Sequence, residues 1–202
     1  MSIERMRLLG GALVAVLLGA VAATLPATAA QAQPTCNHLE ATIVGTEGTD
    51  IINGTPGADV IVALGGSDVV FGLGGNDTVC LGDGVDLYFG SADSEWVCGE
   101  AGADTLFGAG GDDILIGAGG GDTITAGDGA DKVAGGDALD VLNGDGGGDT
   151  IEGGLGSDVL NGGADADTLI DVGGSDVGNG GLGTDTCAAT IETRISCEVV
   201  SA

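Results

Sequence analysis

The sequence has few of the residues from which ordinary protein cores and nucleic-acid-binding surfaces are built. Of its 202 residues, five are aromatic, four are basic and one is histidine, whereas 31 are acidic and 43 are glycine. A chain so poor in large apolar side chains cannot form an ordinary core, and a collagen triple helix is excluded because glycine does not recur at every third position. The formal net charge of -27 argues against nucleic acid and anionic membranes as partners, and it argues for cations.

The segment 1–32 has the three-part pattern of a Sec-type secretory signal peptide. Arg5 and Arg7 precede an apolar run from Leu8 to Leu25, and the segment then ends in small residues. We expect cleavage after Ala32 or Ala29, which would release a secreted, extracellular protein with no membrane span in its mature form. The rival interpretation is an uncleaved anchor, since the apolar run is just long enough to cross a bilayer.

A nine-residue pattern, as in "GLGGNDTVC" from Gly72 to Cys80, fills residues 45–188 without an insertion or a deletion. Position 6 of the sixteen blocks is always acidic, with aspartate fifteen times and Glu95 once. Position 4 is glycine in thirteen blocks, position 1 is glycine in twelve, and position 8 is apolar everywhere except at Gly178. A disordered glycine-rich linker would not keep this phase, so the pattern predicts a solenoid.

Each block predicts a glycine turn over its first six residues and a short strand over its last three. The side chain at position 8 would point inward, and those at positions 7 and 9 outward. Like residues at position 9 recur at every second block, as Phe71, Phe89 and Phe107 and again as Asn143, Asn161 and Asn179. Two blocks should therefore make one coil, and eight coils should form two parallel sheets back to back. The segment Thr42–Val44 should add one more strand at the N-terminal end.

This arrangement would stack carboxylates one coil apart, and their mutual repulsion calls for cations between the turns. Calcium suits such turns because it takes six to eight carboxylate and carbonyl oxygens in an adaptable shell. Magnesium prefers a tight octahedron and retains its waters. Zinc prefers histidine and cysteine ligands, and the only histidine, His38, lies outside the repeats.

The blocks resemble the RTX, or haemolysin-type, calcium-binding nonapeptide repeat, G-G-x-G-x-D-x-U-x. The resemblance implies an all-β protein, a right-handed parallel β-roll or β-helix solenoid of about 16 repeats. It also implies Ca²⁺ ions between turns that lie two blocks apart in the sequence. One turn would offer the carbonyls of positions 2 and 4, the next turn on the same side those of positions 1 and 3, and both turns their position-6 carboxylates.

Carried over by position, the expected carboxylate ligands form two columns of eight. The first column is Asp50, Asp68, Asp86, Asp104, Asp122, Asp140, Asp158 and Asp176. The second is Asp59, Asp77, Glu95, Asp113, Asp131, Asp149, Asp167 and Asp185. The glycines expected to offer carbonyls at positions 1 and 4 are Gly54, Gly57, Gly72, Gly75, Gly108, Gly111, Gly117, Gly120, Gly144, Gly147, Gly153 and Gly156. Seven gaps in each column set a ceiling of about 14 Ca²⁺ ions.

Some blocks depart from the family pattern. Asp93 replaces the position-4 glycine, Glu95 replaces aspartate and Trp96 crowds the strand, so we expect weak or empty sites beside Glu95. Asp165 and Asp171 put the last turns in similar doubt. The family's usual export by a C-terminal signal is not carried over, because this chain has an N-terminal signal instead.

Five cysteines in an exported chain predict disulfides and leave one cysteine over. Cys187 and Cys197 should close the C-terminal cap. Cys80 and Cys98 occupy the same outward position one coil apart, within disulfide reach. Cys36 competes with them for a partner, so the pairing among these three cysteines stays open.

Outward residues suggest two further binding surfaces. Phe71, Phe89 and Phe107 would form an apolar face, which either binds a protein partner or a second copy, or is covered by a terminal segment. The row of Thr150, Thr168 and Thr186 has the residue type of ice-binding solenoids, but Lys132 and other residues interrupt it.

The sequence therefore predicts a signal peptide at 1–32, an N-terminal cap segment at 33–44, an RTX β-roll at 45–188 and a C-terminal cap at 189–202. The function indicated is a secreted calcium-binding protein whose roll folds on binding Ca²⁺. The alternative is a calcium-dependent extracellular adhesion or matrix module that uses the phenylalanine face, and ice binding is a remote third. We expect no enzymatic activity, because no catalytic set can be assembled around His38.

Overall fold

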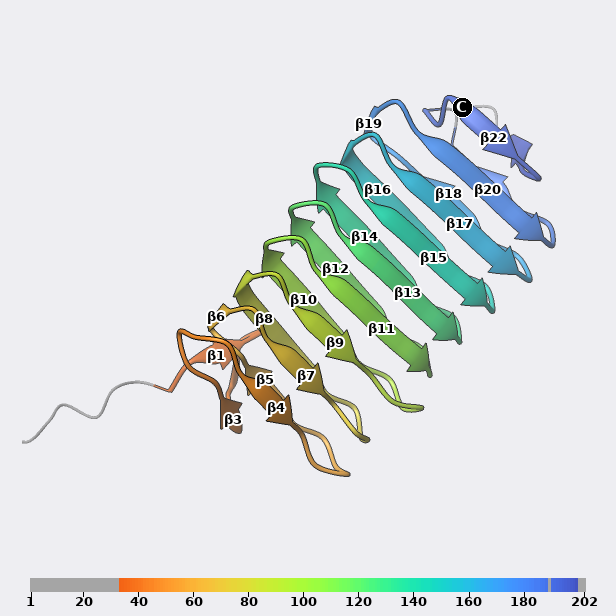
Figure 1. The fold of residues 1–202 in the computed structure, drawn as a ribbon. Helices are drawn as coiled ribbons and strands as arrows, with labels where there is room; N and C mark the ends of the chain where they lie inside the picture. The colour runs from red at the N-terminus through yellow and green to blue at the C-terminus, as the bar shows by residue number, and fades with distance from the viewer. Residues whose placement is uncertain (1–32, 189, 200–202) are drawn as a thin grey trace, which may run out of the picture. The chain divides into compact units, whose positions relative to one another are not determined.

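The computed structural model describes residues 33–188 and 190–199, and every regular element in these ranges is a β-strand (Figure 1). The predicted signal peptide at 1–32 lies outside the described residues. In the described ranges, no helix is long and apolar enough to cross a membrane.

The strands at positions 7–9 of successive blocks alternate between two parallel sheets, as the sequence predicts. The 12-stranded sheet contains β3 (Ile43–Val44), β5 (Val60–Val62), β6 (Gly65–Gly66), β8 (Thr78–Gly84), β10 (Trp96–Ala101), β12 (Ile114–Gly119), β14 (Lys132–Asp137), β16 (Thr150–Gly156), β18 (Thr168–Ile170), β19 (Gly173–Gly174), β21 (Thr186–Cys187) and β23 (Glu198–Val199). The 9-stranded sheet contains β4 (Ile51–Asn53), β7 (Val69–Phe71), β9 (Leu87–Phe89), β11 (Thr105–Gly110), β13 (Thr123–Asp128), β15 (Val141–Gly146), β17 (Val159–Ala164), β20 (Val177–Leu182) and β22 (Thr193–Ile195).

Within the roll, each strand pairs in register with the strand two blocks further along the chain. Trp96 lies beside Ile114 in one sheet, and Leu106 lies beside Ile124 in the other. Two blocks therefore make one coil, and the prediction of an all-β parallel β-roll is confirmed. Many strands are longer than predicted, because the backbone of the turn also pairs with the next turn, as Ala109 does with Gly127.

The core is a single file of position-8 side chains between the two sheets. The side chains of Tyr88, Leu106, Leu115 and their equivalents in the other coils are buried. Only the block that contains Gly178 lacks such a side chain. There, Ile191 from the C-terminal segment fills the space, and an added Cβ at Gly178 would lie 3.1 Å from it.

Side chains at position 9 form ladders on the outer faces of the sheets. The rings of Phe71 and Phe89 stack with centroids 5.1 Å apart, and those of Phe89 and Phe107 with centroids 5.4 Å apart. Further along the same sheet, the Asn161 amide donates a hydrogen bond to the Asn143 side-chain oxygen at 2.9 Å. Such ladders are favourable in parallel strands that pair in register.

The N-terminal segment forms the antiparallel strands β1 (Thr35–Cys36) and β2 (Leu39–Glu40). The buried Cys36 packs with Val62 and Cys80 of the 12-stranded sheet, and Trp96 packs against this cluster. The segment therefore lies on the sheet opposite the phenylalanine ladder and does not cover it.

Two disulfides connect the ends of the roll to its body. Cys36 is bonded to Cys80, and Cys98 is free, which resolves the pairing that the sequence left open. Cys187 is bonded to Cys197, as predicted. The strands β22 and β23 pair with β20 and β21, so the C-terminal segment continues both sheets.

Candidate metal sites

The position-6 acids lie between successive turns, and all but one are buried. Asp50 at the N-terminal end is half-buried, whereas the other fifteen are at most 7 % exposed. They form two columns because turns on the same side of the roll recur at every second block. The structure therefore places every predicted carboxylate ligand in one of the two expected columns.

In the position-6 aspartates after the first coil, one carboxylate oxygen accepts a hydrogen bond from the backbone. The backbone N–H of Asp104 donates to Asp122 Oδ1 at 2.8 Å, and that of Asp113 donates to Asp131 Oδ1 at 2.7 Å. The same bond recurs along both columns to the aspartate of the next coil. There are two exceptions: the Asp176 N–H donates to Glu192 Oε2 at 2.7 Å, and the Glu95 carboxylate is bonded to Ser91 instead. The recurring hydrogen bond aligns consecutive turns, but it involves only one of the two carboxylate oxygens.

That second oxygen, Oδ2, has no hydrogen-bond partner in thirteen blocks, although it is buried. These aspartates are Asp68, Asp77, Asp86, Asp104, Asp113, Asp122, Asp131, Asp140, Asp149, Asp158, Asp167, Asp176 and Asp185. A buried carboxylate oxygen without a partner is costly, and native proteins rarely leave one. Thirteen equivalent cases in one regular array indicate a ligand that the protein itself does not supply.

Three blocks satisfy this oxygen with a hydroxyl residue at position 2. Thr46 donates its backbone N–H and its hydroxyl to Asp50 Oδ2, at 2.7 and 2.8 Å. In the next block, the Thr55 N–H donates to Asp59 Oδ2 at 2.7 Å, and the Thr55 hydroxyl bonds within the same turn.

Glu95 has the same kind of partner in its own turn. The Ser91 hydroxyl donates to Glu95 Oε1 at 2.9 Å, and the Ser91 N–H donates to Oε2 at 3.2 Å. The family pattern gives the position-2 carbonyl a role but predicts none for its side chain. Its signal is nevertheless visible, because these three blocks are the only ones with serine or threonine there.

Burial raises the pKa of several of the aspartates with unpartnered oxygens. The pKa of Asp104, of Asp113 and of Asp149 rises to about 7, first because burial removes water and also because neighbouring acids repel a second negative charge. The pKa of Asp77 and of Asp140 rises to about 6 for the same main reason. In the absence of a cation, these groups retain protons at pH values where an exposed aspartate is ionised.

Backbone carbonyls face the same gaps. An added Cβ at Gly99 would meet the Asp104 carboxylate, and it would lie 2.8 Å from the Gly117 carbonyl oxygen in the next coil. Position-1 carbonyls thus point back toward the preceding turn, as those of Gly72, Gly108, Gly117 and Gly153 do. Position-4 carbonyls point forward to the following turn, as those of Gly111 and Gly156 do.

The donors in each gap are therefore all oxygens, from carboxylates and carbonyls. The described part of the chain contains only two lysines or arginines, Lys132 and Arg194, against its many acids. Lys132 lies at an outward position of β14, away from the columns. An oxygen-only donor set with uncompensated negative charge fits a hard divalent cation, and the absence of histidine from it argues against zinc.

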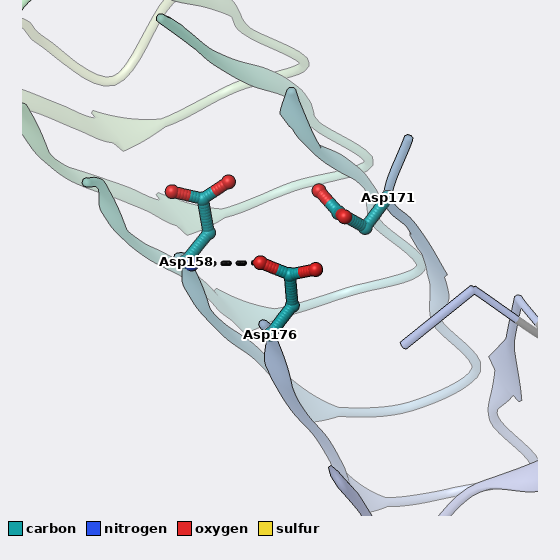
Figure 2. A group of neighbouring side chains, drawn as sticks. All are labelled: Asp158, Asp171 and Asp176. Carbon is teal, nitrogen blue, oxygen red and sulfur yellow. Dashed lines mark hydrogen bonds between the residues drawn. The ribbon is translucent and has the colours of Figure 1, made fainter. Parts of the chain in front are cut away.

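One gap near the C-terminal end differs from the others because it contains a third acid (Figure 2). Asp158, Asp171 and Asp176 are buried, and each offers a carboxylate oxygen within 4.8 Å of those of the other two. Asp171 departs from the family pattern, and this departure was expected to put the last turns in doubt. The structure instead brings its carboxylate to the two position-6 aspartates.

Comparison with known protein families agrees with this geometry. The model of the RTX calcium-binding nonapeptide repeat matches residues 44–79, 53–88, 89–124, 116–151 and 152–187, so that together the matches cover the roll. No curated protein matches the chain. Because the family model covers more than half of the sequence, and its repeat coincides with the observed coils, the chain belongs to the family of RTX calcium-binding nonapeptide repeat proteins.

Proposed function

We propose that the chain is a secreted calcium-binding protein whose β-roll folds when Ca²⁺ binds between its turns. The observation that carries this proposal is the set of thirteen buried aspartate oxygens without a hydrogen-bond partner. Bringing them together without cations requires either protonation or the burial of repelling charges, and both oppose folding near neutral pH. Ions that bind only the folded roll would stabilise it by mass action.

The structure supports a count of ions below the ceiling of 14. Four gaps are flanked by an acid that a hydroxyl residue already satisfies: two at the N-terminal end, beside Asp50 and Asp59, and two beside Glu95. The other ten gaps lie between aspartates whose Oδ2 atoms are both unpartnered. We therefore propose ten strong sites and four weak ones.

Calcium is the preferred ion because of the donors and their spacing. Each gap offers two carboxylates and several carbonyls fixed by backbone pairing, and this number of oxygens suits the six- to eight-fold shell of Ca²⁺. Magnesium would have to give up its waters to use the same donors. We expect Mg²⁺ to be a poor substitute.

A calcium titration followed by circular dichroism tests this proposal, with Mg²⁺ as the matched control. We expect the chain without residues 1–32 to have little β-structure in a chelator and to gain it cooperatively as Ca²⁺ is added. Calorimetry on the same samples should give about ten tightly bound ions. Full β-structure in the chelator, or an equal response to Mg²⁺, would contradict the proposal.

Secretion rests on the sequence pattern of the segment 1–32 and has its own test. The proposal predicts that protein collected from the medium of an expressing cell begins at residue 33 or 30. Mass spectrometry of the intact secreted protein measures this directly. A retained N-terminal segment would instead favour the membrane-anchor interpretation.

We propose a binding role and not a catalytic one. We do not propose that the chain is an adhesion or matrix module. The phenylalanine rings stack on one another with centroids 5.1 and 5.4 Å apart. This stacking within the chain explains the row of phenylalanines, and no binding partner is needed to explain it. His38 lies exposed in the turn between β1 and β2. Neither feature favours a second function.

A further inference from the structure

The gap between turns 153–158 and 171–176 contains a carboxylate that the repeat does not provide. Asp171 occupies position 1 of its block, and it is the only acid at position 1 among the sixteen blocks. Its side chain lies in the same gap as those of Asp158 and Asp176, which belong to consecutive coils of one column (Figure 2). The gap therefore has three carboxylates where the others have two.

Backbone groups from both turns hold the Asp171 carboxylate in place. The Gly154 N–H from the preceding turn donates to Asp171 Oδ1 at 3.1 Å, and the Gly173 N–H from its own turn donates to Oδ2 at 3.1 Å. Gly153 leaves the necessary space, because an added Cβ there would lie 2.5 Å from Asp171 Oδ1 and 2.8 Å from Asp158 Oδ2. The third acid is thus built into the gap and does not reach it from the surface.

A second observation, independent of the clustering, points to a ligand at this place. The Oδ2 atoms of Asp158 and Asp176 are buried without a hydrogen-bond partner, in residues that are 0 % and 1 % exposed. Asp171 is itself only 2 % exposed. Three buried carboxylates so close together must be neutralised by protons or by a cation, and the two unpartnered oxygens are available to bind a cation.

We propose that Asp158, Asp171 and Asp176 together form the tightest Ca²⁺ site of the roll. This inference rests on the proposed function, because it assumes that the gaps bind calcium. The affinity of a calcium site increases with the number of charged ligands and with the rigidity of the site. This gap exceeds the others in charge, and its third ligand is fixed by two backbone hydrogen bonds.

Competition with a chromophoric calcium chelator at pH 7.5 resolves the tightest binding step and tests the inference. In the wild-type chain, one ion should bind about tenfold more tightly than the remaining ions. Asp171→Asn keeps the shape of the side chain and removes its charge. In this variant, the tightest ion should bind with the same affinity as the others. A wild-type titration without a distinct tight step, or a tight step retained in Asp171→Asn, would overturn the inference.

Asp165→Asn is the matched control. Asp165 is an exposed acid in the preceding block and is also a departure from the repeat, at position 4. Asparagine tolerates its positive φ of 73°. This variant loses the same charge and should retain the tight step. Loss of the step in both variants would mean that net charge, and not the site, determines it.

A second measurement needs no variant and is independent of whether Asp171→Asn folds. Crystals of the wild-type protein with one equivalent of Ca²⁺ should show the ion between turns 153–158 and 171–176 first. An ion found first in another gap would overturn the inference but would leave the proposed function intact. Failure of the wild-type chain to bind calcium at all would refute the proposed function itself.

Discussion

At the residue scale, the position-6 aspartate has two separate tasks. Its Oδ1 accepts a backbone hydrogen bond from the preceding coil, as Asp122 Oδ1 does from Asp104, and its Oδ2 is left for a ligand. Asparagine could perform the first task but would bring no charge to the second. This division explains why an acid stands at position 6 in the thirteen blocks with an unpartnered Oδ2, although the backbone bond alone would not require it.

The position-2 hydroxyl residues lead to a prediction about the number of ions. Replacing Ser91 by glycine and Glu95 by aspartate in one variant should free the carboxylate that Ser91 now satisfies. The two gaps beside residue 95 should then bind as tightly as the others. Calorimetry should find about two more tightly bound ions than in the wild-type chain.

The control for this variant separates the two explanations of the weak sites. Asp93→Gly restores the position-4 glycine that the repeat expects but leaves the pairing of Ser91 with Glu95 in place. We expect it to leave the number of tightly bound ions unchanged. If Asp93→Gly alone adds the two ions, the hydroxyl at position 2 is not what weakens these gaps.

The raised pKa values of the buried aspartates predict a dependence on pH. The pKa of Asp104 and of Asp113 is about 7 in the metal-free fold, whereas an aspartate in an unfolded chain has a pKa of about 4. Between these values the metal-free fold binds more protons than the unfolded chain. Its stability therefore falls as pH rises from about 4 to about 7 and changes little above that range.

The unfolded chain has its aspartates ionised throughout pH 5.5 to 7.5, whereas the metal-free fold takes up protons as pH falls through this range. The amount of β-structure in a chelator should therefore increase as pH falls from 7.5 to 5.5. Circular dichroism in the chelator at three pH values in this range measures the effect. An amount of β-structure that is the same at all three values would show that the buried carboxylates do not hold protons in the metal-free fold.

At the scale of the element, the nine-residue block determines which side chains are inside. Leu115 at position 8 is fully buried, and its neighbour Ile114 at position 7 is 37 % exposed. The two residues differ in direction because successive side chains of a strand point to opposite faces. The stability of the calcium-loaded roll should therefore respond to one of these positions and not to the other.

Substitutions at these neighbouring positions test this assignment. Leu115→Ala should lower the free energy of unfolding by about 2–5 kcal/mol, because it leaves a cavity between the sheets. Ile114→Thr should change it by no more than about 0.5 kcal/mol. Both values come from denaturant unfolding at saturating Ca²⁺. Equal effects at the two positions would contradict the observed register.

The repeated strands and turns could be predicted from the sequence because every block has the same pattern. The alternation between two sheets followed from residues that recur at every second block, and the structure confirms it in pairs such as Leu106 with Ile124. Features that occur only once had no such period. The filling of the Gly178 position by Ile191, and the approach of Asp171 to Asp158, depend on the packing of the C-terminal coils.

At the scale of the whole molecule, charge and closure of the ends determine whether the roll forms. Residues 33–202 contain 30 acids, since Glu4 is the only one before them, and two basic residues, for a net charge of -28. Ten to fourteen Ca²⁺ ions would offset most or all of this charge. The ends are closed by the Cys36–Cys80 bond and by the Cys187–Cys197 bond.

Disulfide mapping by mass spectrometry after non-reducing digestion tests how the ends are closed. We expect two cross-linked peptides, one joining Cys36 to Cys80 and one joining Cys187 to Cys197. Cys98 should be recovered as the one free thiol. Cys98 lies in register with Cys80 in the neighbouring strand, so a peptide joining these two would contradict the observed attachment of the N-terminal segment.

The most direct test of the central claim is a crystal structure of the protein grown in saturating Ca²⁺, with attention to the gap between Asp113 and Asp131. The account predicts an ion there, at about 2.3–2.6 Å from the Oδ2 atoms of both aspartates and from carbonyl oxygens of both turns. A gap in which those two oxygens contact only water or protein would contradict it.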